Sequence, residues 1–434
     1  MTTPDRGGSI SATWPLLLGM GVLMLGAGLQ GTLLGLRATL EGFPTPVTGI
    51  IMSCYYVGYL LGTSAAPRMI RQIGHIRVFA ALAALASATI LVQAAFVQWL
   101  TWAVMRFSTG VCLAGIYVVA ESWLNDRASK TNRGRLLAVY MVVLYVGLGI
   151  AQFLLLLANP STSTPFMLVS VLISLSMVPI AVSAQQVPEP ALPKKVRYSE
   201  LYRNSPLGVV AVSVSGMVSA IIFAMGPVYA RLSGLGNRGI ATFMAVSILS
   251  AVLTQYPVGR LSDRTDRRTI IAAVCTLATI VAGCLVVFGA MPRPLFLLLS
   301  GLFSGFALTL YSLSVSHVND KLEPAQMVAA SSALLRLNGG AAAVGPVLAG
   351  SLMAGFGPPA YFATLGSLTG LLTIYDLWRK SRRKPVPQEL KGPFINAQPQ
   401  GMAGTLVNSA ALDAEPLKVG GPSIARDRAV DPES

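Results

Sequence analysis

The chain has 434 residues, of which 53% are hydrophobic and only 11% charged, and its formal net charge is +15. Soluble domains carry about 25% charged residues, so this composition excludes an ordinary soluble domain and predicts a protein embedded in a lipid bilayer. A soluble protein this basic would suggest a nucleic-acid partner. Here the basic residues fall in short loops and the tail, where they set membrane topology, so we expect no nucleic-acid partner.

Twelve apolar segments follow one another along the chain, and each approaches the length that a helix needs to cross a hydrocarbon core of ~30 Å. The first has no short apolar core followed by a small-residue cleavage site, which predicts a retained membrane helix rather than a signal peptide. The expected fold class is an all-α membrane protein. We expect spans at about residues 14–36, 46–66, 77–97, 100–122, 135–157, 165–184, 206–228, 239–258, 269–290, 294–316, 327–350 and 358–378.

A proline-rich and basic stretch separates the sixth expected span from the seventh. It contains Pro188, Pro190 and Pro193, followed by Lys194 and Lys195, which is typical of a linker. The final residues are polar, rich in proline and glycine, and lack helical periodicity, which predicts disorder. The expected domains are a six-helix bundle at 1–184, a cytoplasmic linker at 185–205, a second six-helix bundle at 206–378 and a cytoplasmic tail at 379–434.

Basic residues are concentrated in alternate loops. They follow the second, fourth, sixth, eighth and tenth spans and the last one, whereas the other loops hold only Arg37, Arg231, Arg238 and Arg293. Because positively charged loops stay in the cytoplasm, both termini are expected on the cytoplasmic side.

A charged segment joins the eighth and ninth expected spans as a tight turn. Its order is Gly259-Arg260-Leu261-Ser262-Asp263-Arg264-Thr265-Asp266-Arg267-Arg268. This resembles the G-x-L-x-D-R-x-x-R-R loop signature of the major facilitator superfamily of secondary transporters, except at Asp266, where the family often has glycine. The resemblance implies a cytoplasmic gating loop formed by Gly259, Asp263, Arg264, Arg267 and Arg268. The alternative is a topogenic loop in which an aspartate caps the next helix.

The two expected halves show traces of a repeat. Asn125-Asp126-Arg127 follows the fourth span and Asn319-Asp320-Lys321 follows the tenth, as the parallel halves of such transporters would place them. The first-half counterpart of the loop signature, at 68–77, keeps a glycine and basic residues but has no acid, and its His75 is expected to be solvated.

Three further stretches narrow the resemblance. These are Glu121-Ser122-Trp123-Leu124-Asn125-Asp126, then Arg133-Gly134-Arg135, then Gly147-x-Gly149-x-x-Gln152. They look like the bacterial YcaD-like branch of the superfamily. The resemblance implies a monomeric, cofactor-free transporter in the bacterial inner membrane, with two pseudo-symmetric bundles that move a small solute by alternating access.

Ionisable residues inside expected spans are costly and are therefore functional candidates. Arg106 could hold an anionic group of the solute or take part in proton coupling, or its side chain could reach the outer interface. Glu121 could carry a proton, or it could be a shallow acid paired with Arg127 or Arg133, a placement that the interfacial residue Trp123 would suit. About 22 Å of helix rise separates Arg106 from Glu121, so they cannot pair.

Arg336 lies about 14 Å into the eleventh expected span. It could bind solute or a counter-ion near the bilayer midplane, or it could form a structural bridge. Uncharged polar residues could line the same solute path, although each alone could equally be structural. They are Gln30, Tyr117, Tyr145, Gln152, Tyr311 and His317, together with Tyr56 and Gln255.

Small residues recur at Gly21, Gly28 and Gly35, and again from Gly339 to Gly350, and they predict close helix contacts. The cysteines lie inside apolar runs without metal-ligand spacing, and no phosphate loop or nucleophile–base motif is present, so neither a metal site nor an enzyme is expected. The resulting hypothesis is a secondary transporter driven by protons. The alternatives are an uncoupled carrier and a membrane sensor that binds a partner without transport.

Overall fold

The computed structural model describes residues 10–127, 133–182, 198–288, 291–322, 324–380 and 394. Within these ranges the chain forms helices and no strand. The helices are α1 (Ile10–Leu40), α2 (Thr45–Ile73), α3 (His75–Ala95), α4 (Trp99–Arg127), α5 (Arg133–Leu154), α6 (Thr164–Val182), α7 (Tyr198–Asn204), α8 (Pro206–Leu232), α9 (Asn237–Arg264), α10 (Arg267–Val287), α11 (Arg293–Asn319), α12 (Pro324–Phe356) and α13 (Ala360–Lys380).

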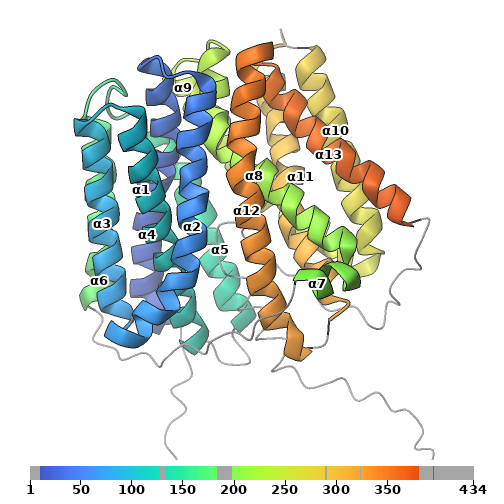
Figure 1. Ribbon diagram of the computed structural model, residues 1–434, viewed down its shortest axis with the longest axis horizontal. Coiled ribbons are helices and arrows are strands. Elements are labelled where there is room, and N and C mark those ends of the chain that lie inside the picture. Colours follow the sequence, from blue (N-terminus) through green and yellow to red (C-terminus); the bar gives the residue numbers. More distant parts are fainter. Residues whose placement is uncertain are drawn as a thin grey trace, which may run out of the picture.

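Twelve of these helices have 19 or more residues, and they match the expected spans in number and order. They form two groups side by side, α1 to α6 and α8 to α13 (Figure 1). Ten are apolar enough by composition alone to cross a membrane; α2 and α13 are more polar but pack within the same bundles. The predicted all-α, twelve-helix membrane fold is confirmed.

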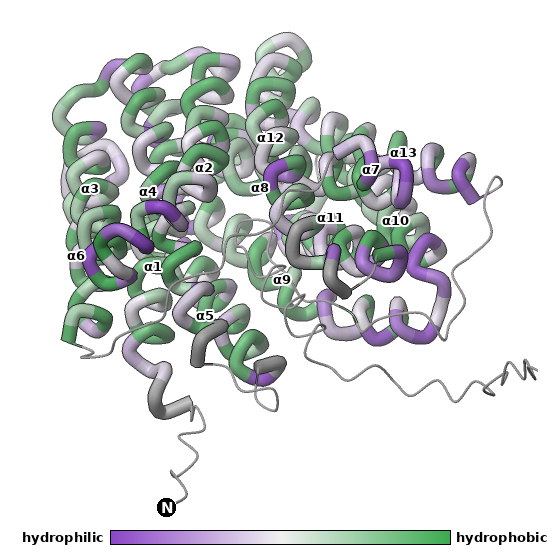
Figure 2. The backbone as a smooth tube through the Cα atoms, turned by 60° about the horizontal axis from the view of Figure 1, so that its bottom comes forward, coloured by the Kyte–Doolittle hydropathy of each residue, from purple (hydrophilic) through white to green (hydrophobic). Residues whose placement is uncertain are grey.

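Hydrophilic residues gather at the helix ends and in α7, whereas the middles of the helices are hydrophobic (Figure 2). The turn between α9 and α10 marks one end of the bundle, which we call the motif end. Asp320, just after α11, contacts Arg267 there, so α11 finishes at the motif end. Thr45 at the start of α2 lies against Gly350 near the end of α12, so α2 begins at the opposite end and runs toward the motif end.

Glycines bring α2 and α4 into backbone contact. A Cβ atom on Gly58 would overlap the Phe107 carbonyl oxygen, and one on Gly110 would overlap the Tyr55 carbonyl oxygen. Only residues without a side chain allow so close an approach. This contact places the tyrosines of α2 against the polar face of α4.

Small residues also join the two halves away from the motif end. A Cβ on Gly49 of α2 would lie 2.5 Å from the Pro346 carbonyl oxygen of α12, and one on Gly35 of α1 would lie 3.3 Å from the Ala224 carbonyl oxygen of α8. The predicted small-residue contacts are confirmed for Gly28, Gly35, Gly345 and Gly350. For Gly340 the prediction was wrong, because an added Cβ would meet nothing within 4 Å.

The segment 259–268 is not the ten-residue loop that the sequence suggested. Helix α9 continues to Arg264 and α10 begins at Arg267, which leaves only Thr265 and Asp266 between them. Asp266 caps α10, because its side chain accepts a hydrogen bond of 3.1 Å from the backbone N–H of Arg268. The residue that departs from the family signature therefore starts a helix.

Two further expectations concern residues outside the spans. The loop histidine His75 is buried, with its Nε2 3.1 Å from the Ser122 hydroxyl, so the expected solvated position was wrong. The expected linker includes the short helix α7, and its remaining residues up to 197 lie outside the described ranges. The expected disordered tail lies outside them too, except for its start up to Lys380 and for Phe394, which packs against Gly259.

Candidate functional site

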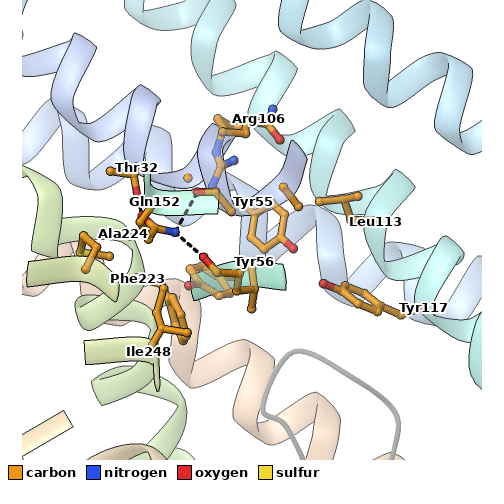
Figure 3. A pocket seen from close by; sticks show the side chains of 16 residues that line it. Thr32, Tyr55, Tyr56, Arg106, Leu113, Tyr117, Gln152, Phe223, Ala224 and Ile248 are labelled. Atoms are coloured by element: carbon orange, nitrogen blue, oxygen red, sulfur yellow. Dashed lines mark hydrogen bonds between the residues drawn. The ribbon is translucent and has the colours of Figure 1, made fainter. Parts of the chain in front are cut away.

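A cavity of about 60 Å³ lies between the two halves (Figure 3). Since a water molecule takes about 30 Å³ in the liquid, this space is small in the present conformation. Its walls come from α1, α2, α4 and α5 of the first half and from α8 and α9 of the second. They consist of Ala27, Gly28, Gln30, Gly31, Thr32, Tyr55, Tyr56, Arg106, Leu113, Tyr117, Leu148, Gln152, Phe223, Ala224, Met244 and Ile248.

Arg106 is the one charged residue among the described residues of this cavity wall. Its side chain is only 6% exposed, and the carbon at the centre of its guanidinium group lies 4.6 Å from the centre of the Tyr55 ring. Its Nε has no hydrogen-bond partner, and none of the ion pairs found in the described part of the chain includes it. Among the described residues, the cation is therefore held by an aromatic face and not by a carboxylate.

Two glutamines in the wall differ in how well they are satisfied. Gln152 is fully engaged: its amide nitrogen donates to the Leu148 carbonyl at 2.8 Å, and its amide oxygen accepts from the Thr32 hydroxyl at 2.5 Å (Figure 3). Gln30 is fully buried, yet neither its amide nitrogen nor its amide oxygen has a partner within the described ranges. Buried polar groups are normally hydrogen-bonded, so Gln30 offers a donor and an acceptor to a bound molecule.

Glu121 lies deeper along α4, toward the motif end, and is only 2% exposed. It lies within electrostatic reach of four buried tyrosines, which come from α2, α4, α5 and α11. They are Tyr59, Tyr117, Tyr140 and Tyr311. Because α11 belongs to the second half, this carboxylate lies where the two halves meet.

The alternative of a shallow, interfacial Glu121 rested partly on Trp123. That side chain is only 3% exposed, so it is packed inside the bundle and does not face a membrane surface. Pairing with Arg127 or Arg133 concerns side chains outside the described ones.

Three tyrosine rings connect the surroundings of Arg106 with those of Glu121. Arg106 lies over Tyr55; the Tyr55 and Tyr59 ring centres are 6.2 Å apart, and those of Tyr59 and Tyr117 are 6.5 Å apart. Tyr117 also lines the cavity and stands one helical turn before Glu121. The glycine contact between α2 and α4 is what allows these rings to meet.

The other predicted solute-path residues are dispersed. Arg336 is exposed on α12 and does not line the cavity. Tyr145 lines a groove between α5 and α9 together with Gln255, whereas Gln152 lines the central cavity. His317 is buried at the motif end near Arg268, Lys321 and Asp266. The structure thus gathers Arg106, Gln30, Tyr117 and Gln152 at one cavity and places Tyr311 beside Glu121.

Three of the predicted gating residues, Asp263, Arg267 and Arg268, form ion pairs at the motif end, whereas Gly259 packs against Phe394. Arg267 is 1% exposed; its Nη2 lies 3.2 Å from an Asp263 carboxylate oxygen, and its Nε lies 3.0 Å from an Asp320 carboxylate oxygen. Arg268 contacts Asp266 at 2.9 Å. The partner Asp320 belongs to the second triplet of the repeat, so the two motifs read separately in the sequence meet here.

Asp266 titrates unusually at this cluster. Burial raises the pKa of its carboxyl group. The hydrogen bonds from Arg268 and the charge of that arginine lower the pKa by a larger amount, so the pKa lies below its ordinary value. The carboxylate is thereby kept ionised at the N-terminus of α10, where a negative charge is favourable.

One buried acid escaped sequence analysis. Asp376 of α13 is 0% exposed, and its carboxylate lies near Lys380, Arg268 and Asp266. It lies two residues before the expected end of the last span, at 378. The helix continues to Lys380, and the spacing of four residues between Asp376 and Lys380 was the available signal. Among the described residues, no group of three or more His, Cys, Asp or Glu side chains could hold a metal ion.

Comparison with known proteins identifies the family of this chain. The Major Facilitator Superfamily profile matches residues 16–340 and 238–412. An uncharacterized MFS-type transporter of Enterobacter sp. strain 638 is 30% identical over 379 residues, covering 86% of this chain and 96% of the relative. The uncharacterized MFS-type transporter YcaD of Salmonella arizonae is 29% identical over 377 residues, covering 86% of this chain and 96% of the relative.

Solved structures show the same fold at low sequence identity. A single-residue mutant of the nucleoside transporter NupG superposes with a TM-score of 0.73 at 12% identity, covering 85% of this chain and 100% of NupG. The fucose:proton symporter FucP of E. coli gives a TM-score of 0.55 at 16% identity, covering 86% of this chain and 100% of FucP. This chain belongs to the Major Facilitator Superfamily and is a multi-pass membrane transporter of small solutes, not an enzyme.

Proposed function

We propose that this protein is a proton-coupled secondary transporter of the bacterial inner membrane that works by alternating access. The observation that carries the proposal is the position of Glu121, a carboxylate that is 2% exposed and lies within electrostatic reach of buried tyrosines from both halves. Holding an ionised carboxylate away from water is costly, whereas the protonated form costs much less.

Motion of the halves supplies the coupling. If the bundles at 1–184 and 206–378 separate at one end, Tyr311 moves away from Glu121 and water reaches the carboxylate. Proton affinity then differs between the two conformations, and a proton shifts their equilibrium by that difference. The ion pairs described at the motif end join residues of α9, α10 and the end of α11, so they stiffen the α9–α10–α11 connection while the halves move.

Orientation follows from charge. The motif end carries the basic loops, so we place it, together with the linker at 185–205 and the tail at 379–434, in the cytoplasm. The fold likeness to a fucose:proton symporter is in keeping with proton coupling. The cavity is enclosed by helices of a single chain, so a monomer is the proposed working unit.

A test without any solute addresses the proton site. Infrared difference spectra of the purified protein, recorded while the pH is changed, should contain a protonated-carboxyl band that disappears in Glu121→Gln. Glu200→Gln, which removes an exposed carboxylate on α7, is the matched control and should keep the band. A band unaffected by Glu121→Gln would remove this residue as the proton carrier.

Transport is tested in liposomes with an imposed pH gradient and with uridine, fucose and lactate as probes. We expect the gradient to accelerate uptake of at least one probe in the wild type and in Glu200→Gln, and to have no effect in Glu121→Gln. Uptake that ignores the gradient in the wild type would instead indicate an uncoupled carrier. Binding of a probe without any flux would indicate a sensor.

A further inference from the structure

We propose that the central cavity is an anion site, in which Arg106 binds the carboxylate of a small organic acid and Gln30 binds a hydrogen-bonding group beside it. This inference rests on the proposed function only in taking the cavity as the place where the solute binds. It adds the chemical class of the solute and the charge that moves with it.

The two other buried arginines that the structure describes are each paired with a carboxylate. Arg267 contacts carboxylates of Asp263 and Asp320, and Arg268 contacts that of Asp266. Arg106 is as inaccessible as Arg268, at 6% and 7% exposed, yet no carboxylate of the described residues pairs with it. The fold therefore provides a counter-ion for the other two buried guanidinium groups that the structure describes and leaves that place open at Arg106.

The groups facing Arg106 do not replace a counter-ion. Its electrostatic neighbours are Tyr55, Tyr56 and Cys54, all on α2. A cation over an aromatic ring is stabilised by the ring's electron-rich face. Removing an ion from water costs more than this contact returns, even after the surroundings relax. The Tyr55 contact therefore offsets only part of the cost, and an anion that enters the cavity would complete the site.

Glu121 is not the missing partner. It is 15 positions from Arg106 on the same helix, which corresponds to about 22 Å of rise. The residues described in the cavity wall include Arg106 and no acid. We therefore expect the anion to come from outside the chain.

Gln30 defines the rest of the ligand. Its side chain is fully buried, and neither the amide nitrogen nor the amide oxygen has a partner in the described structure. An unsatisfied buried polar group destabilises the protein, so a ligand that satisfies both atoms would be favoured. The N–H can donate to a carboxylate oxygen, while the C=O can accept from a hydroxyl or an amino group. Apolar walls at Leu113, Phe223 and Ile248 suit a short hydrocarbon body. A small hydroxy- or amino-substituted monocarboxylate meets all three requirements.

The charges of the bound solute and of the proton predict how transport depends on the membrane potential. A monocarboxylate bound at Arg106 carries one negative charge, and a proton on Glu121 carries one positive charge. Their joint movement transfers no net charge across the membrane. Transport of the anion should then respond to the pH gradient and not to the membrane potential.

Binding is tested on purified protein by thermal shift, with lactate as the probe, lactamide as its neutral analogue and inorganic phosphate as a second anion. A ligand that binds only the folded state raises its stability by RT ln(1 + [L]/Kd). We expect lactate to raise the melting temperature in a dose-dependent way and lactamide to have no effect. Arg106→Gln should abolish the lactate shift, and Arg106→Lys should keep a reduced one.

The matched control is Arg336→Gln, which removes an exposed arginine outside the cavity and should keep the full lactate shift. Size-exclusion profiles and the melting temperature without ligand show whether each variant is folded. The proposal is overturned if lactamide acts like lactate, if the lactate shift survives in Arg106→Gln, if phosphate alone binds, or if no shift occurs in the wild type.

The charge balance is tested in liposomes, where lactate uptake is compared under a pH gradient and under a potassium–valinomycin potential. Vesicles containing Arg106→Gln correct for passive permeation of lactic acid. We expect the pH gradient to drive uptake and the potential to leave it unchanged; uptake driven by the potential would contradict the one-to-one ratio. Since the binding assay uses no gradient, failure of proton coupling and failure of anion binding give different results.

Discussion

Two buried arginines in different halves of the molecule show what this fold does with a cation. Arg267 is 1% exposed and lies against Asp263 and Asp320, with distances of 3.2 and 3.0 Å. Arg106 is 6% exposed and lies over the Tyr55 ring in a cavity whose described lining holds no acid. Both incur the cost of desolvation, but of the two only Arg267 is compensated by carboxylates of the described chain. Arg267 stabilises the fold through its carboxylates, whereas Arg106 is the cation that we propose to bind a ligand.

Replacing each arginine by methionine gives the largest contrast. Arg267→Met leaves the buried carboxylate of Asp320, which is 3% exposed, without this cation. We expect a loss of about 3–5 kcal/mol in unfolding free energy. Arg106→Met removes an uncompensated charge and should leave stability unchanged or raise it. Thermal unfolding in detergent measures both, and a large loss in Arg106→Met would show that its cation is compensated after all.

The two carboxylates of Arg267 differ in burial, so removing each one should destabilise the protein by a different amount. Asp320→Asn weakens the buried contact, and we expect a loss of about 2–3 kcal/mol. Asp263 is 41% exposed, so Asp263→Asn should cost less than about 1 kcal/mol, as exposed ion pairs do. Melting temperatures of the two variants give the order, and equal losses would contradict the burial argument.

Gly110 tests how the fold builds the environment of Arg106. A Cβ there would overlap the Tyr55 backbone, so Gly110→Ala should push α2 from α4 at a cost of about 1–3 kcal/mol. The control is Gly340→Ala, where an added Cβ meets nothing within 4 Å. Because alanine favours a helix over glycine, that variant should gain up to ~1 kcal/mol. Thermal unfolding distinguishes the two signs.

The smallest effect concerns pH at Asp266. Its pKa is below the ordinary value of 3.8 in the folded protein, so its ionised form contributes stability above that value, and this contribution is lost as the pH falls through the folded-state pKa. Asp266→Ala should cost about 1 kcal/mol at neutral pH, as the loss of a helix cap does. Unfolding measured from neutral pH to below pH ~4 should show the difference from wild type shrinking. With Asp266→Asn, which can still cap, the loss at neutral pH should be smaller; an Asp266→Ala difference that does not change with pH would contradict the role of the charge.

The helices were predictable because their signal is local. Each span must present about twenty mostly apolar residues to lipid, and that requirement is visible without knowing any neighbour. The segment 259–268 shows the limit: its charges predicted a loop, yet α9 continues through Asp263 to Arg264. Charged residues can remain helical where a partner such as Arg267, four residues after Asp263, meets them on the same side.

The sequence identified individual candidate residues, but it did not show which of them share one site. Burial cost singled out Arg106 and Glu121, and both are buried. The same reasoning singled out Arg336, which is exposed, because depth along a helix does not reveal which side of it faces protein. Gln30 and Asp376 became distinctive only when their surroundings were known, since an amide or an acid in an apolar run is common whether or not it has a partner.

Composition and residue spacing along the chain were enough to predict the number of spans, their order, the charge asymmetry between the loops and the family. They could not show which helices approach through glycine, which arginine pairs with a carboxylate, or which side chains from both halves enclose one cavity. These outcomes depend on contacts between residues far apart in the chain, such as Arg267 with Asp320 and Gly110 with Tyr55. Such contacts depend on how helices and side chains pack in three dimensions, so no local sequence pattern reveals them.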